Sequence, residues 1–498
     1  MHSSVGLSKA PAAEKPAGEA LTVDLLLVKA GERRNAAAYF RRGIVACEAV
    51  ADLLTITLAV VSGYLAYRHL SLGKHIHYPA HSVLGVALAF AVVMVLMLDR
   101  IGAYRRGNSL LRVRETEQLL RVSAQAFLLS LAVSFFGSIL FSRWLLVLCL
   151  TLVPLALFVE KTLMYSLIRG FHSRGYGIER VMIYGSGCTG RRVFSVLTRS
   201  PKLGMEPVAF VDDDPTKGGH TVFEMGYERK RSAPVVLGPV TRELIARYAV
   251  DLVVIAIPSI GRERFLSTIA EAFGANTRVS FVPSHFLPSD ALIDYQDIDG
   301  VLLASVGKST PRIEYEILKR ICDLVGSLAL MVLGAPVFLL LALLIKVDSR
   351  GAVLFRQERI GQNGKPFGMY KFRTMYTDAV PYDYSPCESS DPRITRIGKF
   401  LRRTSLDELP QLVNVLQGNM SLVGPRPEMP FIVQQYTERH RQRLQVKPGL
   451  TGLWQLSGDR AFLIHENVEY DLYYIQHRNF FMDLAILLHT SIFAMRGI

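Results

Sequence analysis

The chain has 498 residues, 50% of them hydrophobic, and a formal net charge of +14. It is too long for one ordinary domain and too apolar for a simply soluble protein, so we expect several domains and a membrane. The basic balance comes without zinc-finger spacing or basic-aromatic interleaving, which argues against nucleic acid and favours anionic lipid headgroups and phosphorylated partners. The five cysteines show no pairing pattern and suit a reducing cytoplasmic face.

Residues 1–42 are polar and show no cleavable signal peptide, and we expect them to form a mobile cytoplasmic tail. Four apolar stretches of near membrane-spanning length follow, at about 43–67, 82–99, 122–141 and 144–166. Arginines gather before the first stretch, between the second and third, and after the fourth, so these parts are expected in the cytoplasm. The sequence thus predicts four transmembrane helices over 43–168, which serve as an anchor or a dimerisation element. Glu160 and Lys161, near the cytoplasmic end of the fourth, are expected to snorkel toward the headgroups.

A strand, a glycine-rich loop and a helical pattern open the next region, which we assign to residues 178–306. The first strand covers 180–184, a second covers 207–211, and an apolar segment at 251–258 extends a parallel sheet. This order of elements predicts a Rossmann-like α/β domain in the cytoplasm.

The candidate cofactor-binding residues of this domain are Gly185, Gly187 and Gly190 in the loop and Asp212 after the second strand. In dinucleotide-binding folds, such glycines admit a phosphate to a helix N-terminus and the acid takes a ribose hydroxyl. The domain has no evident catalytic group, so a degenerate, regulatory or packing role stays open. The sequence does not decide whether it binds a nucleotide.

Residues 321–347 are nearly continuously apolar and long enough to span a bilayer. Pro336 lies in the middle and would kink or break a helix. Basic residues flank both ends, so the positive-inside rule puts both ends on the cytoplasmic side. We therefore predict that the region 307–350 is a linker and a re-entrant helix that dips into one leaflet. An ordinary transmembrane helix with a tolerated proline is the alternative.

The last region, 351–498, carries residue types suited to phosphate chemistry. Asp407 and Glu408 are adjacent, and neighbouring side chains on a helix point about 100° apart, so they suit different roles. One carboxylate can attack phosphorus while the other holds a divalent cation through oxygen. Basic residues on both sides of the pair would neutralise charge on phosphoryl oxygens. An isolated Asp-Glu pair is more often a solvated helix face, so the surrounding motifs must decide.

From about Lys319 to the C-terminus, the sequence resembles the bacterial sugar transferase family. These are polyprenyl-phosphate hexose-1-phosphate transferases that begin exopolysaccharide, capsule and O-antigen repeat units. The matching segments are 355–361, 371–375, 391–395, 404–412, 421–427, 447–452 and 470–475. The chain departs from the family at 476–480 and in its last residues, which leaves the sugar undetermined. We expect a mainly α-helical catalytic domain, with the apolar segment 480–495 lying in the membrane interface or buried as a core helix.

The resemblance also implies roles for single residues. In that family the Asp of the pair is the nucleophile and the Glu binds Mg²⁺, which gives those roles to Asp407 and Glu408. Arg402 and Arg426 would bind substrate phosphate or nucleotide. The further substrate-binding candidates are Lys371, Arg373 and Asp471. Structural salt bridges are the expected role of Asp378, Asp391 and Asp483.

The expected reaction moves hexose-1-phosphate from a UDP-hexose to undecaprenyl phosphate or another polyprenyl phosphate, releasing UMP through a covalent intermediate on Asp407. It would take place on the cytoplasmic face of the bacterial inner membrane, with Mg²⁺ as cofactor and membrane lipids and a second copy of the chain as further partners. Glucose and galactose are equally compatible with the motifs.

A membrane-anchored nucleotide-sugar dehydratase or epimerase is the competing interpretation, because such enzymes share four helices followed by a Rossmann-like domain. Tyr315 and Lys319 have the Tyr-x-x-x-Lys spacing of their catalytic pair. That pair directly precedes the predicted re-entrant helix, however, and no second glycine-rich fingerprint follows it. A third possibility, an inactive membrane scaffold, would need a degenerate Asp-Glu site, and the site is intact. A purely glycosyl-transferring enzyme is also possible, and it would release UDP rather than UMP.

Overall fold

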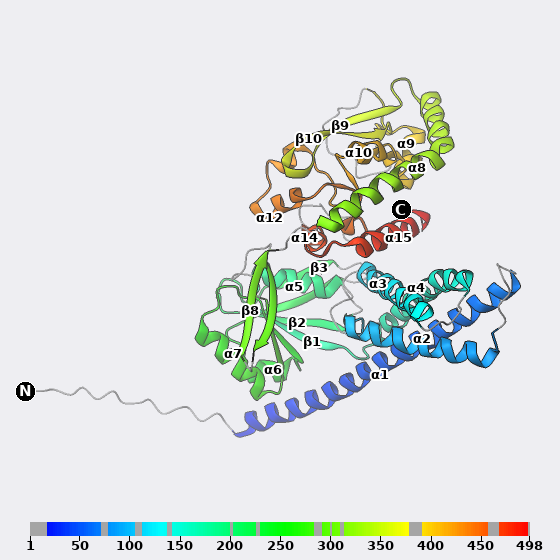
Figure 1. The fold of residues 1–498 in the computed structure, drawn as a ribbon. Helices are drawn as coiled ribbons and strands as arrows, with labels where there is room; N and C mark the ends of the chain where they lie inside the picture. The colour runs from blue at the N-terminus through cyan, green and yellow to red at the C-terminus, as the bar shows by residue number, and fades with distance from the viewer. Residues whose placement is uncertain are drawn as a thin grey trace, which may run out of the picture.

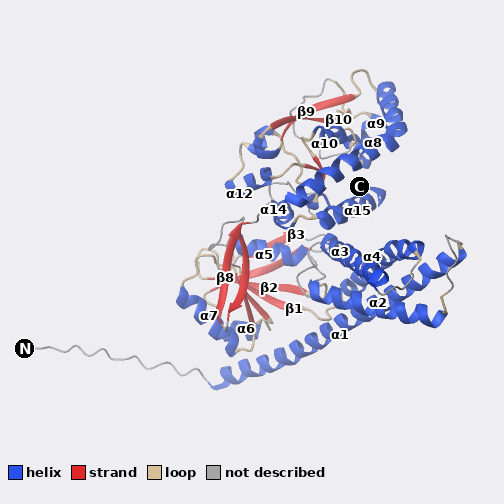
Figure 2. Cartoon of the chain, viewed as in Figure 1, coloured by secondary structure: helices blue, strands red, loops and turns tan. Residues whose placement is uncertain are grey.

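The computed structural model of the protein describes residues 17–70, 78–104, 112–136, 142–199, 203–225, 230–282, 291–298, 301–308, 313–377, 391–456 and 468–496. These residues form a group of long helices, a sheet flanked by helices, and a mainly helical C-terminal region (Figures 1 and 2).

The four long N-terminal helices are α1 (Ala17–His69), α2 (Ala80–Ile101), α3 (Arg112–Phe136) and α4 (Arg143–Ser173). Each contains an apolar stretch long enough, by length and composition, to cross a membrane. Their inner faces form one buried cluster that includes Ile56, Met94, Val122 and Leu157. Their outer faces expose apolar side chains, such as Leu58, Leu96, Leu128 and Leu155. A close-packed interior with an apolar outer surface is suited to lipid.

Helix α1 differs from the sequence prediction at its N-terminal end. It begins at Ala17, so residues 17–42 are helical. Arg33 Nη2 lies 2.7 Å from Asp251 Oδ2, and Arg41 forms an ion pair with Glu179. Both carboxylates are buried in the α/β domain. The prediction of a mobile tail is therefore wrong for residues 17–42, because ion pairs tie this helix to the sheet; residues 1–16 lie outside the described residues.

The expectation for Lys161 was also wrong. Its Nζ is turned inward and lies 2.8 Å from Oδ1 of Asp52, whose side chain is fully buried. Tyr104 donates a hydrogen bond of 2.5 Å to the same carboxylate. An isolated charge among apolar helices is costly, so a paired arrangement is the favourable one. The ion pair joins α1 to α4.

The α/β domain is built on a six-stranded sheet in the order β3-β4-β2-β1-β5-β6. The strands are β1 (Glu179–Tyr184), β2 (Met205–Asp212), β3 (Thr221–Met225), β4 (Lys230–Leu237), β5 (Leu252–Ile255) and β6 (Arg278–Phe281). All neighbouring pairs are parallel except β3 with β4. The parallel sheet predicted from the first, second and later strands is confirmed.

The helices of this domain are α5 (Cys188–Arg199), α6 (Arg242–Arg247) and α7 (Arg262–Gly274). Successive side chains of β1 point to opposite faces, as the pleat requires. Val181 and Ile183 pack into one hydrophobic cluster, whereas Met182 and Tyr184 pack into another. An antiparallel hairpin of β7 (Ala291–Ile298) and β8 (Val301–Lys308) follows.

The C-terminal region is mainly helical, as expected. Its larger elements are α8 (Ile313–Asp348), the hairpin β9 (Leu354–Ile360) and β10 (Pro366–Phe372), α9 (Arg396–Thr404), α10 (Gln411–Gln417), α14 (Val468–His477) and α15 (Phe480–Arg496). Its short elements are η2 (Gln362–Gly364), η3 (Leu406–Glu408), β11 (Ser421–Val423), α11 (Pro430–Val433), α12 (Glu438–Arg441), η4 (Gln442–Gln445), β12 (Gly449–Thr451) and α13 (Leu453–Leu456).

Helix α8 is one 36-residue helix with Pro336 inside it, and in Figure 1 it changes direction part-way along. Its middle exposes large apolar side chains, among them Leu328, Val332, Leu333, Leu339 and Leu343. Arg320, near its start, donates hydrogen bonds to two carbonyls at the end of α10. Asp348, at its end, accepts a hydrogen bond of 3.0 Å from the first turn of α9. Both ends of α8 therefore bind the same C-terminal region.

Helix α15 lies partly in the core. Met482, Ala485 and Ile486 are buried in a cluster with side chains from α10 and β11, which favours the core-helix alternative for this segment. The helix also packs on α3, where His489 Nε2 lies 2.9 Å from the hydroxyl of Thr116. The first turns of α3 thus join the N-terminal helices to the C-terminal region.

Candidate active site

The Asp407–Glu408 pair sits in a short turn between two helices. Thr395 caps α9 by accepting a hydrogen bond of 2.9 Å from the amide of Gly398. Ser405 ends the helix in the left-handed conformation, with φ +56°, and the chain then enters η3. Leu406 packs into the cluster beneath the turn. With three residues per turn in such a helix, the two carboxylates point in different directions.

Glu408 is held by two cations. Its Oε1 accepts a hydrogen bond of 2.8 Å from Lys371 Nζ on β10 and another of 2.8 Å from Arg426 Nη2. Burial alone would raise the pKa of Glu408, but Arg426 and Lys371 outweigh it and hold that pKa well below its ordinary value. Glu408 is therefore ionised in the folded protein, and the structure brings two predicted substrate-binding residues to it.

Asp407 is the less restrained of the two carboxylates. Among the described residues it makes no hydrogen bond or ion pair. Burial raises its pKa above the ordinary value, Lys371 opposes that rise, Glu408 adds to it, and Arg426 and Arg402 oppose it. A carboxylate close to cations but bonded to none of them keeps its lone pairs available for attack on an electrophile.

The Arg426 segment is positioned by a close backbone contact. Strands β11 and β12 pair in parallel, with Ser421 opposite Gly449. A Cβ atom on Gly424 would lie 2.5 Å from a backbone carbonyl oxygen of the segment before β12. Only glycine fits such an approach. The two glycine-containing motifs that seemed separate in the sequence therefore touch, and they aim Arg426 at Glu408.

Asp471 lies behind this segment rather than beside the carboxylate pair. Its Oδ2 accepts a hydrogen bond of 2.7 Å from Nε of Arg443, and both side chains are almost fully buried. Arg443 Nη2 in turn donates a hydrogen bond of 3.1 Å to the backbone carbonyl of Arg426. Asp471 thus contacts the candidate site through Arg443, which the sequence analysis did not identify.

Arg359 is a second buried cation missed as a site residue. It donates a hydrogen bond of 3.3 Å to the carbonyl of Pro427 and one of 2.8 Å to Gln357. Burial and the neighbouring Arg426 lower the pKa of Arg359 to about 10, although two glutamates oppose this shift. The only sequence signal was its place in a matching segment of the family.

Arg373 lies elsewhere. Its Nη2 donates hydrogen bonds of 2.7 and 2.8 Å to the carbonyl and hydroxyl of Ser349, just after α8. Among the described residues it makes no contact with Asp407 or Glu408. The substrate-binding role of Arg373 stays a prediction, and the structure places this side chain at the end of the apolar helix.

The two described candidates for structural salt bridges form them. Asp391 binds Arg393 at 2.9 Å, and Asp483 binds Lys319 at 2.8 Å. Asp378 lies outside the described residues. Tyr315 donates a hydrogen bond of 2.8 Å to Asp483 as well. Tyr315 and Lys319 thus both bind the carboxylate of Asp483 in a buried cluster. This contact removes the observation that favoured a dehydratase.

The candidate cofactor residues of the α/β domain stabilise the conformation of the glycine-rich loop itself. Asp212 Oδ2 accepts hydrogen bonds of 2.7 and 2.8 Å from the amide and hydroxyl of Ser186. Burial would raise the pKa of Asp212, but these bonds lower it below its ordinary value. A Cβ on Gly190 would lie 1.8 Å from the carbonyl oxygen of Gly185, so this glycine lets α5 approach β1. Their role in binding a cofactor, like that of Gly187, stays a prediction.

Among the described residues no group of three or more His, Cys, Asp or Glu side chains could hold a metal ion. Glu408 nevertheless uses only Oε1 in its hydrogen bonds. Its Oε2 makes no hydrogen bond or ion pair within the described part of the chain. Mg²⁺ is commonly held by one or two carboxylates together with substrate phosphates. The residues present therefore fit a magnesium ion that arrives with a phosphorylated substrate.

Two family models match the chain. The bacterial sugar transferase model matches residues 314–497, and a CoA-binding domain model matches residues 100–283. The first match covers every residue of the candidate active site.

Curated relatives match over most of the chain. The UDP-glucose:undecaprenyl-phosphate glucose-1-phosphate transferase of Klebsiella pneumoniae is 30% identical over 70% of this chain and 74% of that protein. An uncharacterized sugar transferase of Haemophilus influenzae is 31% identical over 76% of this chain and 81% of that protein. The undecaprenyl-phosphate galactose phosphotransferase of Salmonella typhimurium is 29% identical over 77% of this chain and 81% of that protein. The chain belongs to the bacterial sugar transferase family and is a sugar-phosphate transferase.

Proposed function

We propose that this protein transfers hexose-1-phosphate from a UDP-hexose to undecaprenyl phosphate and releases UMP. The reaction would be the first membrane step of exopolysaccharide, capsule or O-antigen synthesis, on the cytoplasmic face of a bacterial inner membrane. One observation carries the proposal. Lys371 and Arg426 hold Glu408 in place, while the adjacent Asp407 makes no hydrogen bond or ion pair among the described residues. The substrates named for the relatives in Klebsiella and Salmonella support the choice of donor and acceptor.

Two displacements at one phosphorus atom give this product. In the first, an oxygen of Asp407 bonds to the β-phosphorus of the UDP-hexose, the bond from that phosphorus to the bridging oxygen breaks, and UMP leaves. Hexose-1-phosphate then remains on the carboxylate as an acyl phosphate. In the second, a phosphate oxygen of undecaprenyl phosphate bonds to the same phosphorus and the acyl-phosphate bond breaks. Asp407 returns as a free carboxylate and the sugar leaves on a lipid diphosphate.

The cations around the pair stabilise these steps. Lys371 and Arg426 neutralise Glu408 in the resting site and are close enough to share their charge with phosphoryl oxygens. Arg402, in the last turn of α9, adds a further positive charge near Asp407. Glu408 Oε2 is the position at which Mg²⁺ would be held. When bound there, Mg²⁺ would neutralise charge on the phosphoryl oxygens and on the departing UMP.

The arrangement of α8 supports a re-entrant helix. A straight helix of this length would extend about 54 Å, well beyond the roughly 30 Å apolar core of a bilayer. Arg320 and Asp348, near its two ends, both contact the same C-terminal region. Pro336 lies between them, and proline is the common cause of a sharp bend. Such a helix holds the site at the interface, where a soluble sugar nucleotide meets a lipid phosphate.

The proposal is tested by UMP release from the purified protein with Mg²⁺, undecaprenyl phosphate and a panel of UDP-sugars. We expect release with one sugar, ping-pong kinetics, and complete loss in Asp407→Asn. Incubation with the radiolabelled donor and no lipid should label wild-type protein, and the label should be absent from Asp407→Asn. Undiminished release by the variant, a sequential kinetic pattern, or UDP in place of UMP would contradict the proposed mechanism.

The proposal includes a homodimer in which the N-terminal helices provide the contact. Mass photometry of the protein in detergent or nanodiscs should give twice the mass of one chain. A monomer that retains full activity would remove the dimer from the proposal without affecting the chemistry.

A further inference from the structure

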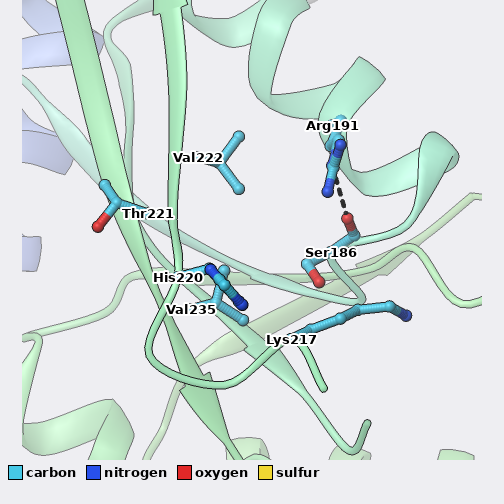
Figure 3. Close-up of a pocket in the computed structure, with 7 residues that line it drawn as sticks. All are labelled: Ser186, Arg191, Lys217, His220, Thr221, Val222 and Val235. Carbon is cyan, nitrogen blue, oxygen red and sulfur yellow. Dashed lines mark hydrogen bonds between the residues drawn. The ribbon is translucent and has the colours of Figure 1, made fainter. Parts of the chain in front are cut away.

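A cavity outside the candidate active site lies at the C-terminal edge of the α/β sheet (Figure 3). Its volume is about 330 Å³. The wall on one side is the glycine loop and the start of α5, and the wall on the other is the β3–β4 hairpin. The lining residues are Ser186, Arg191, Lys217, His220, Thr221, Val222 and Val235. In open parallel α/β sheets this edge is where ligands bind.

The cavity has a basic polar side. Three of its lining residues are basic and none is acidic. Arg191 uses only Nε, which donates a hydrogen bond of 3.0 Å to the carbonyl of Ser186. Its two terminal nitrogens, and the ring of His220, have no hydrogen bond or ion pair within the described part of the chain. Lys217 is different, since its Nζ lies 3.5 Å from Asp212 and 3.3 Å from Asp214.

Part of the cavity lining is apolar. Val222 and Val235 line the cavity, and in Figure 3 Arg191 lies above Ser186 and His220 lies beside Val235. Val235 is buried, so it forms a fixed wall. A ligand that fills this space must combine a flat or apolar part with a strongly anionic group.

The neighbouring acid does not oppose such a ligand. Asp212 is turned into the glycine loop, where it accepts both hydrogen bonds that Ser186 donates. The carboxylate therefore occupies donors that a dinucleotide phosphate would use, and its charge is also opposed by Lys217, whose Nζ lies 3.5 Å from Oδ2. Because the Ser186 donors of the glycine loop are already used, we expect an anion that binds this domain to contact Arg191 and His220 instead.

We propose that this cavity binds a nucleoside phosphate, with its phosphate group at Arg191 and His220 and its base or sugar against Val222 and Val235. The planar guanidinium fork matches phosphate geometry, and the volume lies within the range of small-ligand pockets. None of the residues of the candidate active site lines this cavity. The site is thus separate from the proposed transfer reaction and would report a soluble nucleotide to the enzyme.

The test uses the purified full-length protein in detergent and isothermal titration with AMP, ADP and inorganic phosphate; UMP is left out because it is the proposed product of the active site. At least one nucleoside phosphate should bind saturably, more tightly than inorganic phosphate, and the affinity should fall with added salt. Arg191→Ala should weaken binding by about tenfold or more, as expected for a charge-assisted hydrogen bond. The matched control is Arg247→Ala, which removes an exposed arginine on α6 in the same domain and should leave the affinity unchanged.

Two further variants keep the result unambiguous. His220→Ala should weaken binding in the same direction as Arg191→Ala; both residues are exposed, so unaltered circular dichroism should accompany the loss. Arg426→Gln disrupts the candidate active site and should leave this binding intact. Loss of binding in Arg426→Gln but not in Arg191→Ala would overturn the assignment, as would equal affinity for inorganic phosphate. The absence of saturable binding up to about 1 mM would overturn it too.

Discussion

Replacing Lys371 with methionine removes one of the two cations that hold Glu408. The lost hydrogen bond is 2.8 Å long and joins two side chains that are 18% and 17% exposed. A hydrogen bond between charged groups contributes about 1.5–3 kcal/mol, which corresponds to roughly a tenfold to 150-fold change in rate. We expect Lys371→Met to lower kcat/KM for UMP release by that factor. Lys371→Arg keeps the charge and should recover part of the loss.

The same substitution should change the pH dependence of the reaction. Lys371 is the strongest of the charges that oppose the raised pKa of Asp407. Asp407 must be ionised to attack phosphorus, so activity is lost as the pH falls through its pKa. Without Lys371 that pKa rises further, and the acid limb of kcat/KM should move to higher pH.

The control for both effects is Lys399→Met. Lys399 is an exposed lysine on α9, close in sequence to the carboxylate pair, and its side chain makes no described contact with it. This variant should match wild type in rate and in pH profile. An unmoved acid limb in Lys371→Met, or an equal loss of rate in Lys399→Met, would refute the account of Glu408 and Asp407 given above.

Three other predictions concern the residues around the site. Glu408→Gln should raise the Mg²⁺ concentration for half-maximal UMP release by more than about tenfold, and an unchanged Mg²⁺ requirement would exclude it as a metal ligand. Arg443→Met should destabilise the protein by about 3–5 kcal/mol, because it leaves the buried carboxylate of Asp471 without its ion-pair partner. Asp471→Asn should cost less, because Glu428 Oε1 still lies 3.9 Å from Arg443 Nη1. The double variant should cost less than the sum; additivity within about 0.5 kcal/mol in denaturation curves would contradict the ion pair. Gly424→Ala should lower stability by roughly 1–3 kcal/mol through overpacking, whereas Gly274→Ala, with nothing within 4 Å of its added Cβ, should not.

Local patterns were enough to locate the carboxylate pair and the parallel sheet. Asp407 and Glu408 are adjacent, and the motifs around them are continuous segments that can be recognised one at a time. The order of strand, glycine loop and strand around Gly185 likewise needs only neighbouring residues. These elements follow from sequence because their defining contacts are short-range.

The buried residues that position the candidate active site could not be predicted from local sequence patterns. Arg443 meets Asp471 across 28 residues, and Arg359 meets Pro427 across 68. Neither arginine stands out among the many basic residues of this chain. Their function comes from burial and from the backbone carbonyls they contact, which depend on the tertiary fold. The helical state of residues 17–42 escaped prediction for the same reason, since its ion pairs lie on a distant sheet.

The ion pair between Asp52 and Lys161 has a consequence for the order in which the helices enter the membrane during synthesis. The two residues are 109 positions apart. A ribosome adding about 5–20 residues per second takes roughly 5–20 s to make that interval. During this time α1 carries a carboxylate whose cationic partner has not yet been synthesised, and an unpaired acid among apolar membrane helices is costly. We therefore expect α1 to leave the insertion machinery for lipid only after α4 has supplied Lys161.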